Sequence, residues 1–223
     1  VFNTSYANYV KKNIKAKYIL LGSPLSNIQK ITNKKKNGIC YISPFAIRTY
    51  LMALKNKKFF KEFYQSEINF LKKLSKLAKS FKTQLFIFGK RKDKTFQNLE
   101  KKFYNNIDKN IKFIQNSYSR NTFKMVNNYK LIVGISSTMN LELLGRKNKV
   151  FFFTSRLKKY PYSTRKFGYF GNLKPEGLFW SSSDNYNYVM SKIKKLYLIN
   201  DLAWGKIYNR FNDKYACFFD YKN

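Results

Sequence analysis

One stretch constrains the fold of this chain more than any other: residues 129–153, YKLIVGISSTMNLELLGRKNKVFFF. The apolar, β-rich run at 131–135 is typical of a strand buried in a parallel sheet. It ends at Ser136, Ser137 and Thr138, whose hydroxyls can cap a following helix, and a second apolar run begins at Val150. The pattern therefore predicts strand, turn, helix, turn and strand, which is the repeating unit of an α/β fold.

The turn at 136–138 is also a candidate phosphate site. A helix N-terminus presents backbone N–H groups without partners and carries a partial positive charge, so it suits an anion. Glu142 lies about one turn further along the predicted helix, where a carboxylate can reach a ribose or sugar hydroxyl. Because Ser and Thr cap helices in proteins of every kind, a purely structural turn is the alternative.

The alternation of strands and helices extends over most of the chain. Periodicity and breaker residues predict a strand that begins after Gly38 and stops at Pro44. Further strands are predicted at 84–90, 111–115, 131–135 and 150–153. Helices are predicted at 59–79, 91–107, 186–198 and from Asp201 onward. Asp184 is the expected N-cap of helix 186–198, and a long aromatic loop follows Phe153. This order predicts a Rossmann-like, doubly wound parallel α/β sheet.

Further polar residues follow the other predicted strands. In such a sheet the ligand lies at the carboxyl ends of the strands, where this chain places Lys90, Arg91 and Tyr118 beside the Ser-Ser-Thr turn. Glu100 and Glu142 are the carboxylates on helices that can face this edge, with a solvent-facing helix charge as the alternative for each. Neither G-x-G-x-x-G nor a P-loop is present, which disfavours a nicotinamide dehydrogenase or an ATPase.

The charge balance suggests two kinds of partner. With 45 basic and 11 acidic residues the formal net charge is +34, which ordinarily points to nucleic acid or to an anionic membrane surface. Base-reading proteins favour Arg, whereas the excess here is Lys, spread with Asn, Ile, Phe and Tyr over the whole chain. We interpret this as compositional drift that disfavours nucleic acid, and we keep a basic RNA- or ribosome-binding protein as the alternative function.

Several kinds of chemistry are excluded by what the sequence lacks. The chain has no histidine, and Cys40 and Cys217 are far apart without partners at metal-ligand spacing, so neither a histidine base nor a zinc site is expected. Two cysteines fit a reducing cytoplasm, with a disulfide left open. The apolar runs are shorter than the roughly 18 residues that span a bilayer. Because the sequence begins at Val1, we interpret it as a processed chain or a fragment.

Three segments carry a family resemblance: KLIVGISSTMNLELLGRKNKVFFFTSR, FGNLKPEGLFW and DLAWGKIYNRF. Together they resemble the carboxyl-terminal part of bacterial O-antigen or capsule biosynthesis proteins with the GT-B glycosyltransferase fold. YVKKNIKAKYILLGSPLSN is similar to the end of their acceptor domain, CYISPF to the first strand of their donor domain, and LEKKFYNNI to the helix bearing Glu100. The resemblance implies that residues 1–38 end an acceptor domain with its linker and that residues 39–223 form a nucleotide-sugar (donor) domain.

By this resemblance, Ser136, Ser137 and Thr138 would hold the donor phosphate and Glu142 would bind ribose or sugar hydroxyls, while Lys90 and Arg91 would neutralise the leaving group. Tyr118 and Glu100 complete the expected substrate-binding set. The resemblance implies no cofactor besides the nucleotide-sugar substrate, a lipid-linked or saccharide acceptor, and a cytoplasmic protein at the inner membrane face that makes lipopolysaccharide or other surface polysaccharide. The chain departs from relatives with a His-Pro element because it lacks His, so the donor nucleotide and the catalytic residues stay open.

Overall fold

A computed structural model describes residues 11–17, 19, 37–90, 93–116, 122–135, 137–153 and 176–215. In these ranges six strands form one sheet in the order β3-β2-β1-β4-β5-β6, and every neighbouring pair is parallel. The strands are β1 (Ile39–Ile42), β2 (Leu85–Phe88), β3 (Lys112–Ile114), β4 (Leu131–Gly134), β5 (Val150–Phe153) and β6 (Trp180–Ser181). The order reverses between β1 and β4, which confirms the predicted doubly wound parallel sheet.

The register brings the ends of the central strands to one edge of the sheet. Ile42, the last residue of β1, lies opposite Phe88 of β2 and Gly134 of β4. The Ser43 N–H donates to the Phe88 carbonyl over 3.0 Å, so the strand pairing continues into the loop that follows β1. The loops after β1, β2 and β4 therefore leave the sheet side by side, as expected for parallel strands.

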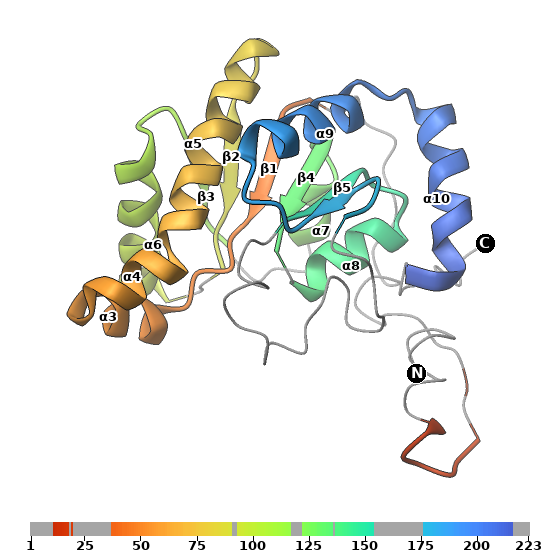
Figure 1. Cartoon of the computed structure of the whole chain (residues 1–223), viewed down its shortest axis with the longest axis horizontal. Helices are drawn as coiled ribbons and strands as arrows, with labels where there is room; N and C mark the ends of the chain where they lie inside the picture. Colours follow the sequence, from red (N-terminus) through yellow and green to blue (C-terminus); the bar gives the residue numbers. More distant parts are fainter. Residues whose placement is uncertain are drawn as a thin grey trace.

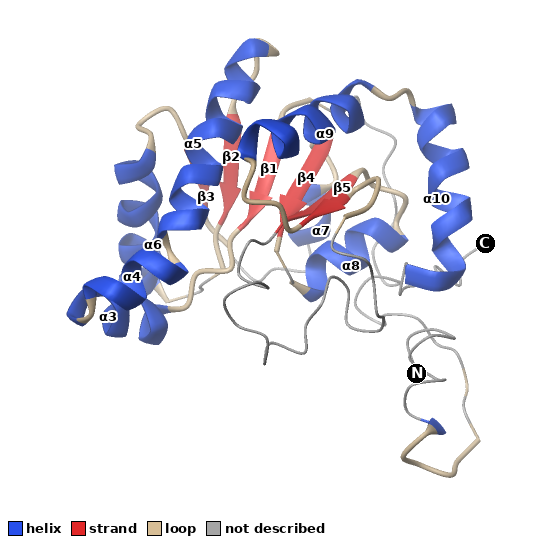
Figure 2. Ribbon diagram, in the orientation of Figure 1, coloured by secondary structure: helices blue, strands red, loops and turns tan. Residues whose placement is uncertain are grey.

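Helices cover both faces of the sheet (Figures 1 and 2). They are α3 (Ile47–Lys55), α4 (Lys57–Phe63), α5 (Gln65–Ser80), α6 (Lys94–Ile107), α7 (Thr122–Val126), α8 (Thr138–Gly145), α9 (Tyr186–Leu198) and α10 (Asp201–Tyr215). Because side chains alternate between the two faces of a strand, a contact between a strand residue and a helix shows which face of the sheet that helix covers. Phe153 stacks on Phe70 of α5 with centroids 4.1 Å apart, whereas Gly134 contacts Asn140 of α8 on the opposite face.

The prediction of one helix over 59–79 is wrong. The segment contains α4 and α5, which meet at Tyr64, and α3 precedes them. The Asn56 side chain accepts from the Phe59 N–H over 3.0 Å and caps α4, which is a local signal for a separate helix. Tyr64 is buried at the junction, 5.6 Å from the Phe103 ring of α6, so aromatic packing fixes the break.

Two predictions in the carboxyl-terminal part are also wrong. Helix α9 has the predicted bounds, but its N-cap is Asn185 rather than Asp184, because the Asn185 side chain accepts from the Tyr188 N–H over 3.1 Å. Trp180 and Ser181 fall in the stretch predicted as loop, yet they form β6 by pairing with β5. The preceding residues 154–175 lie outside the described ranges.

Helix α10 packs onto the end of α8 and the turn between α8 and β5. The Trp204 Nε1–H of α10 donates to the Lys147 carbonyl over 2.8 Å, and the Tyr208 hydroxyl donates to the Gly145 carbonyl over 3.0 Å. These contacts anchor α10 on α8. No helix among the described residues is both long and apolar enough to cross a bilayer. Most of the predicted acceptor-domain segment, residues 1–10, 18 and 20–36, lies outside the description, so the domain boundary stays a prediction.

Candidate functional site

The helix predicted after β4 begins as expected. Ser137 is the N-cap of α8, with extended backbone angles of φ −72° and ψ 137°, and its Oγ accepts from the Met139 N–H over 3.3 Å. Thr138 is the first helical residue and is exposed, and Glu142 is half-buried one turn further along. The start of α8 therefore presents a hydroxyl and helix N–H groups at the carboxyl edge of the sheet.

A close contact with β4 fixes the position of this helix. Asn140, in the first turn of α8, is fully buried against Gly134 at the end of β4. A Cβ atom on Gly134 would lie only 1.9 Å from the Asn140 amide nitrogen, so the glycine is what allows the helix to approach the strand. Within the described residues, neither the amide nitrogen nor the amide oxygen of Asn140 has a hydrogen-bond partner.

Glu100 braces the loops that follow β1 and β2. Its carboxylate accepts from the Lys90 N–H over 2.9 and 3.2 Å and also from the Ser43 hydroxyl. Glu100 is fully buried, so its interpretation as a solvent-facing helix charge is wrong. Lys90 itself is exposed, and its backbone N–H is held by Glu100 at the end of β2.

A second buried carboxylate, Glu67 of α5, lies in the same polar cluster. It accepts from the Tyr41 hydroxyl over 2.9 Å and from the Tyr104 hydroxyl over 3.2 Å. The Tyr104 hydroxyl is also 2.8 Å from Ser43 Oγ, which links Glu67 to Glu100 through two hydroxyls. Burial, and then the charge of Glu67, raises the pKa of Tyr104 well above its usual range. The phenol therefore stays protonated, and its single proton can be donated to Glu67.

Glu67 is a site residue that sequence reasoning missed, although the sequence contains a signal. It lies three residues before Phe70 and four before Leu71, so it belongs to the apolar stripe of α5. A carboxylate at such a position must be buried with partners or disrupt the helix packing. Glu100 occupies the same kind of position on α6, three residues before Phe103.

The structure brings part of the predicted site together. Lys90 and Glu100 are in direct contact, while Ser137, Thr138 and Glu142 follow β4, on the other side of β1 from them. All five lie toward the same edge of the sheet. The remaining predicted residues lie outside the description: Ser136, Arg91 and Tyr118.

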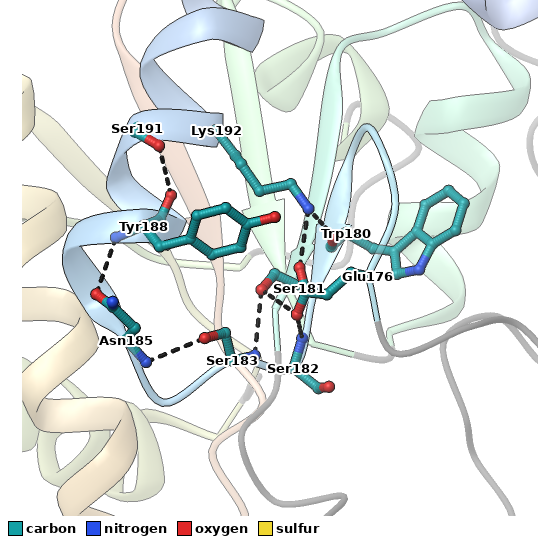
Figure 3. Close-up of polar contacts among 9 residues, drawn as sticks. All are labelled: Glu176, Trp180, Ser181, Ser182, Ser183, Asn185, Tyr188, Ser191 and Lys192. Atoms are coloured by element: carbon teal, nitrogen blue, oxygen red, sulfur yellow. Dashed lines mark hydrogen bonds and ion pairs between the residues drawn. The ribbon is translucent and has the colours of Figure 1, made fainter.

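A serine-rich turn connects β6 to α9 at the same edge (Figure 3). The Glu176 carboxylate accepts from Ser181 Oγ over 2.8 Å and from the Lys192 ammonium over 2.9 Å. The Ser183 N–H donates to Ser181 Oγ, and Ser183 Oγ accepts from the Asn185 N–H. Because these groups bind one another, the turn is a structural connection rather than part of the candidate site.

The class of fold is Rossmann-like, because the strand order of the open parallel sheet reverses between β1 and β4, and folds of this class bind ligands at such a point. The sequence comparison identifies the family. A model described as "putative O-antigen biosynthesis protein" matches residues 1–223, so the chain belongs to this family. This match confirms the resemblance to surface-carbohydrate biosynthesis proteins. No curated protein matches the chain.

Two solved structures are similar to the chain in fold. A mutant of Staphylococcus aureus TarM in complex with fondaparinux, α-GlcNAc-glycerol and UDP is 16% identical, with a TM-score of 0.47 over 96% of this chain and 40% of that one. A variant of the wall teichoic acid polymerase TagF with CDPG is 12% identical, with a TM-score of 0.45 over 95% of this chain and 55% of that one. The chain thus spans about half the length of these proteins or less.

Proposed function

We propose that this chain is the donor-binding part of a glycosyltransferase and forms the carboxyl-terminal half of a GT-B fold. In this proposal it takes a sugar from a nucleotide sugar during O-antigen, lipopolysaccharide or related surface polysaccharide synthesis. The observation that carries the proposal is the capped start of α8 beside the reversal of strand order between β1 and β4. Membership of the O-antigen biosynthesis family supports the choice of a sugar over other phosphorylated ligands.

The proposed chemistry needs stabilisation of negative charge. When the bond between the sugar C1 and the donor phosphate oxygen breaks, charge accumulates on that phosphate. The helix N–H groups and the hydroxyls of Ser137 and Thr138 would donate to it, and the exposed Lys90 ammonium would supply a full positive charge. Glu142 would accept from ribose or sugar hydroxyls. Ser136, Arg91 and Tyr118 stay candidates for the same ligand by their place in the sequence.

In this proposal Glu100 positions a loop and does not contact the substrate directly. Because its carboxylate is fully buried and already binds Ser43 and the Lys90 N–H, it would position the Lys90 loop rather than bind sugar. Glu67 would support it through Tyr104 and Ser43. The two carboxylates would hold the loops after β1 and β2 in place before the ligand arrives.

The proposed partners follow from the reaction. The donor is a nucleotide sugar, with the nucleotide left open, and the acceptor is a saccharide or a lipid-linked saccharide. An acceptor in the membrane would require this cytoplasmic protein to work at the inner membrane face, with peripheral contact to anionic lipid favoured by the excess of lysine.

Replacements of the α8 cap test the donor site. Asn and Asp cap helices as well as Ser, so Ser137→Asn and Ser137→Asp should both fold normally. Ser137→Asp places a negative charge at the proposed phosphate position and should weaken nucleotide-sugar binding by roughly tenfold or more, whereas the neutral Ser137→Asn should bind nearly as the wild type. CMP-, UDP-, GDP- and dTDP-linked sugars would be titrated by calorimetry. Equal binding by both variants would remove α8 from the site.

The competing function is a basic RNA- or ribosome-binding protein, supported by the net charge of +34. Titration with a single-stranded RNA at moderate salt discriminates between the two. Binding of RNA that falls steeply with salt, without saturable binding of any nucleotide sugar, would favour the RNA alternative.

A further inference from the structure

Helix α3 exposes an unusual number of large apolar side chains for a surface helix. Leu51, Met52 and Leu54 have exposed fractions of 47%, 65% and 57%, all within nine residues. Ile47, Leu51 and Leu54 are spaced i, i+4 and i+7 and so share one face of the helix, of which Ile47 is buried while Leu51 and Leu54 continue the apolar face beyond the packed core. Neighbouring exposed apolar residues of this kind mark a surface that binds something.

Exposed cations flank these apolar residues in the sequence. Arg48 and Lys55 lie on the exposed side of α3, and Lys57, Lys58 and Lys61 follow on α4. Glu62 is the one acidic residue in the sequences of the two helices. Lysine is depleted in the core of protein–protein interfaces, whereas a lipid surface with anionic headgroups accepts apolar and cationic side chains together.

We infer that α3 and the start of α4 form a docking surface for an anionic membrane, with Leu51, Met52 and Leu54 inserted among the acyl chains. Arg48 and Lys55 would contact the headgroup phosphates. We call this the α3 lipid surface. This surface locates the membrane contact proposed above, and its role in bringing the site to a lipid-linked acceptor rests on the proposed function.

The α3 lipid surface lies at the same end of the molecule as the candidate site. Residues 43–46 connect the end of β1 directly to α3, and Ser43 in this connection binds Glu100. Figure 1 shows α3 and α4 beyond the end of the sheet toward which the strand arrows point. A molecule attached through α3 would therefore hold the loops after β1 and β2 near the membrane, where a lipid-linked acceptor is present.

Vesicle partition of the full chain tests the apolar component. The triple variant Leu51→Gln, Met52→Gln and Leu54→Gln keeps good helix formers, so α3 should still fold, which circular dichroism would verify. Its partition coefficient onto mixed phosphatidylglycerol and phosphatidylcholine vesicles should fall by roughly tenfold or more. The matched control is Leu198→Gln with Leu202→Gln, which removes two apolar residues that are exposed on α9 and α10 beside other lysines. This control should partition like the wild type.

A tryptophan reporter locates the inserted residues independently of any loss of affinity. Trp180 and Trp204 are buried, so Met52→Trp adds a tryptophan whose emission responds to lipid. Phosphatidylcholine brominated in its acyl chains, mixed with phosphatidylglycerol, should quench Met52→Trp strongly and Leu202→Trp hardly at all. Equal quenching at both positions would contradict insertion of α3.

Three other outcomes would overturn the inference. Unchanged partition of the triple variant would mean that net charge alone holds the chain on vesicles. Equal partition onto pure phosphatidylcholine would remove the role of the cations. A change of sedimentation coefficient in the triple variant without loss of lipid binding would assign the surface to a second copy of the chain. Lipid binding through α3 without nucleotide-sugar binding would leave this inference standing while the proposed function fails.

Discussion

Replacement of Gly134 by alanine tests how β4 and α8 fit together beneath the candidate site. The added Cβ would lie 1.9 Å from Nδ2, 2.7 Å from Cγ and 2.8 Å from Oδ1 of Asn140. These distances are far below van der Waals contact, so one of the two elements must move. β4 is held on both sides by β1 and β5, and Asn140 is fully buried, so neither residue can move without disturbing the packing.

The size of the effect follows from overpacking. An extra buried carbon in a well-packed core costs about 1–3 kcal/mol, so Gly134→Ala should lower the free energy of unfolding by that amount. In a domain of this size the melting temperature should fall by roughly 2–4 °C for each kcal/mol. Asn140→Ala should cost little, because it removes an amide whose two polar atoms are buried without hydrogen-bond partners among the described residues.

Urea unfolding of the two single variants and the double variant, followed by circular dichroism, gives the coupling energy. The double variant should recover most of the stability lost in Gly134→Ala, with a coupling of about 1–3 kcal/mol. Gly205→Ala is the matched control, since its Cβ would meet nothing within 4 Å in α10, and it should raise stability by roughly 0.5–1 kcal/mol. Additive effects of Gly134→Ala and Asn140→Ala would refute the proposed contact.

Two further predictions concern hydrogen bonds away from the site. The hydrogen bond from the Ser75 hydroxyl, and to a lesser degree that from the Asn110 N–H, holds the pKa of Asp108 well below its usual range. The ionised carboxylate therefore stabilises the fold at pH values above its unfolded-state pKa of about 3.9. This contribution is lost as the pH falls below that value. Asp108→Asn should therefore destabilise the chain by roughly 1–2 kcal/mol at neutral pH and by less at about pH 3, and urea unfolding showing equal losses would be inconsistent with this. Tyr208→Phe leaves the Gly145 carbonyl without its hydroxyl donor and should lower the unfolding free energy by about 1 kcal/mol in the same assay, whereas no loss would show that this bond contributes nothing.

The sequence was most informative where one local signal decides the structure. Apolar β-branched runs predicted β1 to β5, and the capped turn predicted the start of α8 at Thr138, because buried strands and helix caps depend on adjacent residues. The same reasoning predicted the bounds of α9. It placed the cap one residue early, since Asp184 and Asn185 are both good caps and only the geometry of the turn after β6 selects Asn185.

Long-range packing decided what the sequence did not predict. The break between α4 and α5 depends on Tyr64 packing against Phe103, almost forty residues away in the chain. β6 is only two residues long and exists because β5 offers it a parallel edge. The pairing of Glu67 with Tyr41 and Tyr104 joins three separate elements, so the sequence can indicate that Glu67 is buried but not which groups bind it.

Hydrogen exchange with and without a bound nucleotide sugar tests the central claim most directly. The account predicts that the ligand slows exchange in peptides covering the start of α8 and the loops at 43–46 and 89–90, with little change at the opposite ends of β1 and β4. It also predicts that this protection disappears in Ser137→Asp and persists in Ser137→Asn. Protection confined to α9 and α10, or protection by RNA but by no nucleotide sugar, would contradict a donor site at this edge of the sheet.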